Sequence, residues 1–234
     1  MADNEYPRGD LLVDADWLAE HGQDQGVRMI DCAAVEAYRR AHIPGAVALG
    51  NINPYIKDAT DETYVMPPTA FADLMGGLGV GDETLVVTYD DNNSLLAARL
   101  WWVLQYYGHT NAKVLNGGWH KWLYEGRAVT THATRPDPAT FTPKPNEEVL
   151  CRLDRLEDTI GAAESGILDV RSKEEFAGTN SRGNRRVGHV PGAKHIEWLD
   201  FVTADDRRVF KPAAEIRSML ERAGIHPEQE VVTY

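Results

Sequence analysis

The sequence predicts an α/β protein made of two copies of one domain, each a parallel sheet with helices on both faces. Short apolar runs alternate with helical segments along the chain, which is typical of parallel strands joined by crossover helices. The run Val86-Val87-Thr88-Tyr89 also returns as Val231-Val232-Thr233-Tyr234. A β-branched run that ends in an aromatic residue indicates a buried strand, and in parallel sheets functional groups lie just beyond the carboxyl ends of such strands.

The helices of the first copy are predicted from the residues that start and stop them. Asp14 or Asp16 can cap the first helix, and Pro68 is a favoured first-turn residue of the second. Glycine follows each predicted end, where a left-handed residue commonly stops a helix. In chain order we expect helices over 17–21, 68–78 and 94–107, ended by Gly22, Gly79 and Gly108, and a closing helix opened by Gly117-Gly118-Trp119.

The strands of the first copy are predicted from apolar runs between polar turns. The Pro44-Gly45 pair forces a turn that leads into one of them, and residues 50–67 are expected to form an irregular loop. The strands are expected over 27–32, 47–49, 85–89 and 113–115.

After Arg127 the alternation of strands and helices stops. Four prolines, Pro136, Pro138, Pro143 and Pro145, fall within ten residues, which predicts a linker. The second copy then repeats the order of the first, with a helix over 153–163, a strand over 167–170, a helix over 212–223 and a final strand over 231–234. We therefore predict domains over 1–130 and 149–234 and a linker over 131–148.

The spacing of equivalent residues defines the duplication. Asp31 and Asp169 are 138 positions apart, His42 and His189 are 147 apart, and Thr88 and Thr233 are 145 apart. The rise from 138 to 147 requires an insertion of nine residues before His189 in the second copy. The insertion contains Arg182, Arg185 and Arg186.

The chain contains one motif twice: an aromatic residue, a short spacer and His-Ile/Val-Pro-Gly-Ala, and each copy follows a strand that ends in Asp. In this motif the chain resembles the rhodanese family. The resemblance covers residues 11–234, and Val114-Leu115-Asn116-Gly117-Gly118-Trp119 is similar to the family's second signature. It implies a two-domain thiosulfate or 3-mercaptopyruvate sulfurtransferase that needs no cofactor. In that family the first domain is usually inactive, and the second carries a nucleophilic cysteine directly after its fourth strand. This position follows Tyr234, so we expect the second domain to be incomplete and residues 1–234 alone to be inactive.

The resemblance implies a two-step reaction in which a cysteine thiolate takes sulfane sulfur from thiosulfate, releases sulfite, and passes the sulfur to cyanide or a thiol acceptor. A tight turn into a helix leaves backbone N–H groups pointing one way, which would stabilise such a thiolate. In the first copy this position is Asp90, and a carboxylate carries no transferable sulfur. Residues 90–94 are therefore expected simply to cap the helix at Ser94.

Arg182, Arg185 and Arg186 are the candidate substrate-binding residues, because guanidinium groups hold oxyanions through paired hydrogen bonds. The alternative is an exposed loop without a ligand. Arg185 and Arg186 are favoured because they lie closest to His189. Vertebrate-type relatives have arginine where this chain has Glu175, a departure that favours thiosulfate over mercaptopyruvate.

The remaining motif residues are expected to be structural. His42 and His189 precede identical Pro-Gly-Ala turns and are predicted to bond a nearby backbone carbonyl. Asp31 and Asp169 end matching strands near the expected loop, where either can hold the loop or an arginine such as Arg171. Cys32 and Cys151 lack metal-ligand spacing, so we expect two free buried thiols and no metal site, with a catalytic role for Cys32 as the weaker alternative.

The composition limits the partners. A net charge of −12 argues against nucleic acid and anionic membranes, which require a basic face. No apolar run approaches the roughly 20 residues that span a bilayer, and the first ten residues lack a signal pattern, so we expect a cytoplasmic protein. Two other functions stay open: a phosphatase-like enzyme with a cysteine loop one residue longer, and a non-catalytic binding or regulatory pair.

Overall fold

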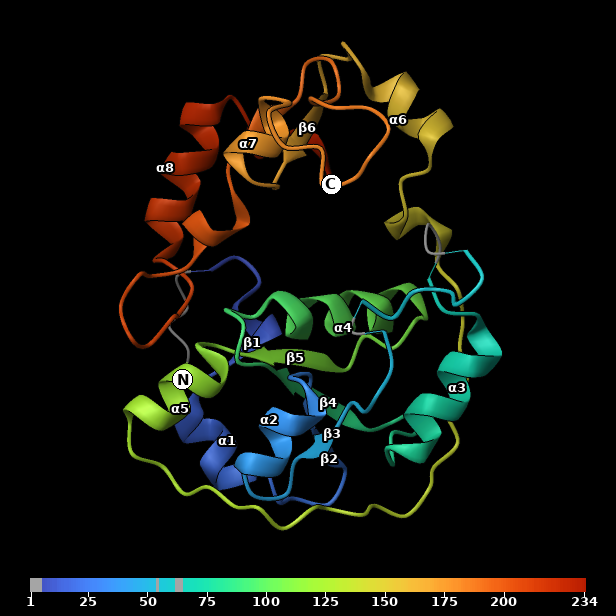
Figure 1. Cartoon of the computed structure of the whole chain (residues 1–234), viewed down its shortest axis with the longest axis vertical. Coiled ribbons are helices and arrows are strands. Elements are labelled where there is room, and N and C mark those ends of the chain that lie inside the picture. The colour runs from blue at the N-terminus through green and yellow to red at the C-terminus, as the bar shows by residue number, and fades with distance from the viewer. Residues whose placement is uncertain (1–5, 54, 62–64) are drawn as a thin grey trace. The chain divides into compact units, whose positions relative to one another are not determined.

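The computed structural model describes residues 6–53, 55–61 and 65–234, and the chain divides into two compact units (Figure 1). Unit 1 extends to Val149 and also includes Ala204–Val209, whereas unit 2 comprises Leu150–Thr203 and Phe210–Tyr234. The segment 131–148, predicted to be a linker, belongs to unit 1. Its Thr142 donates to Asp82 from both backbone and side chain, and its Phe141 is buried edge-on against Phe71.

Unit 1 is built on a five-stranded parallel sheet in the order β1-β5-β4-β2-β3. The strands are β1 (Leu12–Val13), β2 (Val27–Asp31), β3 (Val47–Ala48), β4 (Leu85–Tyr89) and β5 (Ala112–Leu115). The strand with the repeated sequence, β4, lies at the centre between β2 and β5. β1 was not predicted, because two residues are too few to show a period.

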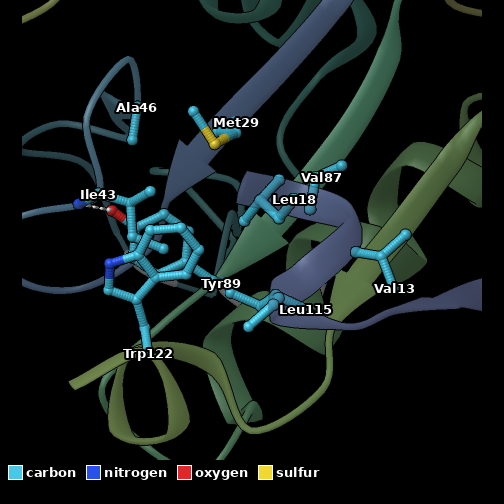
Figure 2. Packing of buried hydrophobic residues seen from close by; sticks show 10 residues of the cluster. Val13, Leu18, Met29, Ile43, Ala46, Val87, Tyr89, Leu115 and Trp122 are labelled. Atoms are coloured by element: carbon cyan, nitrogen blue, oxygen red, sulfur yellow. Dashed lines mark hydrogen bonds between the residues drawn. The ribbon is translucent and has the colours of Figure 1, made fainter. Parts of the chain in front are cut away.

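Helices cover both faces of this sheet, since alternate residues of a strand point to opposite sides and both sides are apolar. On one face α1 (Ala15–His21) and α5 (Gly118–Tyr124) pack against Met29, Val87 and Tyr89 (Figure 2). On the other face lies α4 (Leu95–Tyr106), where the Thr88 hydroxyl donates to the carbonyl of Ala97. The remaining helices are α2 (Val35–Arg40) and α3 (Pro68–Gly77), with short 3₁₀ turns at Gly9–Leu11 and Glu147–Val149.

Unit 2 repeats part of this plan with three parallel strands in the order β7-β6-β8. They are β6 (Ser165–Asp169), β7 (Lys194–His195) and β8 (Glu230–Thr233), accompanied by α6 (Leu153–Thr159), α7 (Lys173–Phe176), a 3₁₀ turn at Trp198–Phe201 and α8 (Ala213–Ala223). Leu168, Ile196 and Ile225 form its buried core. Val231 of β8 is 39% exposed, whereas its counterpart Val86 in β4 is fully buried.

These two parallel sheets with helices confirm the predicted α/β class. Of the two predicted caps for α1, Asp14 is the one used, because its carboxylate accepts from the N–H of Trp17 at 2.8 Å. α6 ends at Thr159, four residues earlier than predicted. In the described part of the chain, no helix combines the length and the apolar character needed to cross a bilayer.

Candidate functional site

The repeated tyrosine makes the same contacts at the carboxyl edge of both sheets. In unit 1 the Tyr89 hydroxyl accepts from the N–H of Ile43 at 3.2 Å, a bond drawn in Figure 2, and hydrogen-bonds the carboxylate of Asp31. In unit 2 the Tyr234 hydroxyl accepts from the N–H of Val190 at 2.9 Å and hydrogen-bonds Asp169. The tyrosine thus joins the strand to the neighbouring Asp and to the Pro-Gly-Ala turn.

The two motif histidines occupy matching structural positions. Nδ1 of His42 lies 2.7 Å from the carbonyl oxygen of Tyr38, and Nδ1 of His189 lies 2.8 Å from that of Phe176. Each imidazole also stacks on the same aromatic residue, with ring centroids 3.6 Å and 3.8 Å apart. The predicted contact with a backbone carbonyl is confirmed, and both rings connect a short helix to the turn that follows it.

The Asp90 carboxylate fills a ring of backbone donors at the start of α4. One oxygen accepts from the N–H groups of Asn92 and Ser94 at 2.8 and 2.9 Å, and the other from those of Leu96 and Ala97 at 2.7 and 2.8 Å. We call these four N–H groups the N–H cradle. The carboxylate is 1% exposed, so burial raises its pKa, and the four donors oppose that rise.

The prediction that residues 90–94 cap this helix is therefore confirmed, with Asp90 as the capping residue. Ser94 precedes the first residue of α4, yet its side chain makes no capping bond. Asn93 and Ser94 both adopt the left-handed conformation, with φ of 55° and 67°. This backbone, uncommon for residues other than glycine, curls the turn around Asp90 and points the N–H groups inward.

A glycine of the second signature allows α5 to approach this turn. A Cβ on Gly118 would lie 2.6 Å from the carbonyl oxygen of Asp90, too close for any other residue to fit without movement. The same carbonyl accepts from the N–H of Trp119 at 3.0 Å. The Gly-Gly-Trp sequence therefore supports the turn after β4.

Asp31 and Asp169 hold equivalent positions but have different partners. The fully buried Asp169 carboxylate accepts two bonds from the Arg171 guanidinium, Nε to Oδ1 at 3.0 Å and Nη2 to Oδ2 at 2.5 Å. Burial alone would raise the pKa of Asp169, but Arg171 and the backbone donor lower it below its usual value. Unit 1 has Ala33 in place of Arg171, and burial raises the pKa of Asp31 to about 6.

The three candidate arginines differ in their surroundings. Arg182 pairs with Glu175, with Nε 3.3 Å from Oε2. Glu175 is itself nearly buried and forms a capping box with Ser172 at the start of α7. Arg185 and Arg186 are exposed, and no ion pair involves them within the described residues. The residue that departs from the family pattern, Glu175, thus holds one of the three arginines.

Neither cysteine has the surroundings of a nucleophile. Cys32 is 2% exposed, and burial together with the negative charges of Asp90 and Asp31 raises its pKa well above the ordinary value. Cys151 is half-buried rather than buried as expected, and burial raises its pKa as well. Reactive thiols require a lowered pKa, so the alternative of a catalytic Cys32 is disfavoured. Among the described residues, no three His, Cys, Asp or Glu side chains gather to hold a metal ion.

Comparison with known proteins identifies a shared family. A family model described as a rhodanese-like domain matches residues 14–125 and again 152–234, which confirms the tandem organisation. The sulfur carrier protein TtuD of Thermus thermophilus is 34% identical over 98% of this chain and 83% of its own length. A putative thiosulfate sulfurtransferase of Haloferax volcanii is 32% identical over 100% of this chain and 84% of its own length. The thiosulfate sulfurtransferase of Bos taurus is 31% identical over 90% of this chain and 76% of its own length.

Solved structures show the same fold. The crystal structure of SseA from Escherichia coli, described as a 3-mercaptopyruvate sulfotransferase, superposes with a TM-score of 0.84 at 25% identity, covering 95% of this chain and 87% of its own. A structure of EanB from a complex with ergothioneine gives a TM-score of 0.83 over 99% and 63% of the two chains. At 20% identity, that second likeness concerns the fold alone.

Proposed function

The chain belongs to the rhodanese family, and from that premise we propose that it moves sulfane sulfur from thiosulfate to cyanide or a thiol through a cysteine persulfide. We place the nucleophilic cysteine at the position that follows Tyr234. Asp90 is its counterpart in unit 1, which we propose is inactive in sulfur transfer. The names of the curated relatives support a sulfur donor and a sulfur acceptor as the substrates.

The N–H cradle around Asp90 is the observation that carries this proposal. Four backbone donors converge on one anionic group directly after a strand that ends in Val-Val-Thr-Tyr. The carbonyl of Tyr89 accepts from the backbone N–H of Cys32 at 2.8 Å, and the carbonyl of Tyr234 accepts from the backbone N–H of the equivalent Val170 at 3.0 Å. β4 therefore pairs with β2 in the same register in which β8 pairs with β6. A thiolate or persulfide held by such donors would be stabilised as an anion.

The proposed reaction balances without a cofactor. The thiolate attacks the sulfane sulfur of thiosulfate, a new S–S bond forms, and the old S–S bond breaks as sulfite leaves with the electron pair. Cyanide then attacks the outer sulfur of the persulfide, which gives thiocyanate and restores the thiolate. Asp90 has no sulfur to transfer, and its carboxylate already occupies the donors that a thiolate would need.

The experiment that tests this function is mass spectrometry of the protein after incubation with thiosulfate. We expect a gain of one sulfur atom on the cysteine after Tyr234, and loss of that sulfur with formation of thiocyanate when cyanide is added. The Cys32→Ser and Cys151→Ser variants should keep both results. Loss of labelling in either variant, or thiocyanate formation by a verified product of residues 1–234, would refute the placement of the nucleophile.

Assays with other substrates separate the alternatives. Faster labelling by 3-mercaptopyruvate than by thiosulfate would favour the donor named for the relative SseA. Hydrolysis of an aryl phosphate without sulfur labelling would favour a phosphatase-like enzyme, and no reaction with any of these compounds would favour a binding module.

We further propose that Arg185 and Arg186 recruit the thiosulfate dianion. Replacing both with alanine is expected to raise the KM for thiosulfate about fivefold and leave kcat unchanged, since exposed charge pairs contribute up to about 1 kcal/mol. Steady-state kinetics at constant ionic strength measures this. Arg222→Ala, which removes an exposed charge from α8, is the matched control. An unchanged KM in the double variant would assign the loop no role in donor binding.

A further inference from the structure

Unit 1 contains a cavity of about 120 Å³ at the carboxyl edge of its sheet. A water molecule needs roughly 10–15 Å³ on this measure, so the cavity has room for a small ligand. Asp31, Asp91, Trp119 and Arg40 supply the charged and aromatic part of its lining, and alanines supply the rest. No role in the proposed sulfur transfer involves this cavity.

The duplication shows what fills the equivalent space in unit 2. Two of the lining alanines, Ala33 and Ala41, correspond to Arg171 and Gly188 by the offsets of 138 and 147. In unit 2 the guanidinium of Arg171 binds the Asp169 carboxylate through two bonds and donates to the carbonyl of Gly188 at 2.9 Å. The cavity therefore lies where unit 1 has no counterpart of the Arg171 guanidinium.

The Asp31 carboxylate of unit 1 accepts the same backbone hydrogen bond as its counterpart Asp169 in unit 2. Asp31 accepts from the N–H two residues later, Ala33, at 2.9 Å, and Asp169 accepts from the N–H of Arg171 at 3.0 Å. Asp31 is only 3% exposed, and in the described parts of the chain no ion pair joins it or Asp91 to a cation. A buried carboxylate without a cation is costly, so a bound cation would relieve that cost.

The other lining groups favour a planar monocation. The lining includes the indole of Trp119, and guanidinium groups stack on such rings. The lining contains two carboxylates and one guanidinium, that of Arg40, so its net charge is negative. A flat cation with paired donors matches Asp31 in the way that Arg171 matches Asp169.

We propose that this cavity of unit 1 binds the guanidinium group of a small molecule, which pairs with Asp31 and stacks on Trp119. The ligand class is a monocationic guanidino compound. The site is separate from the N–H cradle, because the cradle is filled by the carboxylate of Asp90, and it is independent of whether the protein transfers sulfur.

Titration with methylguanidinium chloride, followed by NMR chemical shifts at constant ionic strength, tests the proposal. We expect one saturable site that shifts the amides of Asp31, Ala33 and Trp119. Ala33→Arg supplies the missing guanidinium from the chain, and Asp31→Asn removes the carboxylate. Each should weaken binding by about tenfold or more, the effect of losing a charged hydrogen-bond pair.

Two controls make the test specific. Arg39→Ala removes a neighbouring exposed charge that does not line the cavity and should not weaken binding. Arg171→Ala frees the equivalent carboxylate of Asp169, so methylguanidinium should then also shift the amides of Asp169 and Gly188. The absence of a saturable site in unit 1 of the unaltered protein would overturn the proposal. So would equal affinity in a folded Ala33→Arg or Asp31→Asn variant.

Discussion

Replacing Asp90 with alanine is expected to destabilise unit 1 by about 3 kcal/mol, because it leaves buried backbone N–H groups without an acceptor. The carboxylate is 1% exposed and serves four such donors, so the loss should exceed that of an ordinary helix cap. Urea denaturation followed by tryptophan fluorescence measures it. Five of the six tryptophans, Trp17, Trp101, Trp102, Trp119 and Trp122, lie in unit 1, and therefore dominate the signal.

Two variants provide the controls for Asp90. Asp90→Asn retains one acceptor oxygen and should lose less stability than Asp90→Ala. Ser94→Ala changes the residue just before α4, whose side chain makes no capping bond, and should change stability little. If Ser94→Ala were as destabilising as Asp90→Ala, the assignment of the cap to Asp90 would be wrong.

The repeated strand was predictable because its signal is local. Val-Val-Thr-Tyr is β-branched, apolar and duplicated, and the structure places both copies in parallel strands at the predicted residues, within one position. The histidine contacts were predictable for a related reason. Identical Pro-Gly-Ala turns after His42 and His189 require one shared structural role, and the carbonyl of the preceding aromatic residue is within reach in both.

Which of residues 90–94 caps the helix was not predictable from helix signals. Capping rules relate a side chain to N–H groups two or three residues later, whereas Asp90 reaches the N–H of Ala97, seven residues on. That reach depends on left-handed backbone at Asn93 and Ser94, which no residue type in the turn demands. The proline-rich segment was similarly ambiguous, since extended chain can either connect domains or lie along one, and only the burial of Phe141 shows the latter.

The equivalent strands and turns of the two units share the same arrangement but carry different charged groups. Both retain the Asp–Tyr hydrogen bond and the tyrosine contact with the turn. Unit 2 has a guanidinium beside its Asp, whereas unit 1 has an alanine and a cavity. Unit 1 has a carboxylate in the N–H cradle, where we propose a cysteine in unit 2. The charged groups beside the equivalent Asp residues thus differ between the units, while the backbone N–H bound by each Asp and the tyrosine contact with the turn stay the same.

Replacing Arg171 with alanine is expected to destabilise unit 2 by about 3 kcal/mol, because it leaves the fully buried Asp169 carboxylate without its counter-ion. Hydrogen exchange of the β6 amides measures this loss within unit 2. Asp169→Asn combined with Arg171→Ala should recover part of it, since the uncompensated charge is then absent. A double variant less stable than Arg171→Ala would show that packing of the arginine, rather than charge pairing, dominates.

The pH dependence of the same variant distinguishes charge from packing further. The pKa of Asp169 is lowered in the folded protein, so the pair stabilises unit 2 above the unfolded pKa of about 3.9. This stabilisation is lost as the pH falls through the lower, folded pKa. The difference in stability between the unaltered protein and Arg171→Ala should therefore be constant near neutral pH and shrink in acid. A difference that persists in acid would mean that Arg171 acts mainly through its contact with the Tyr234 ring, whose centroid lies 5.0 Å from the guanidinium carbon.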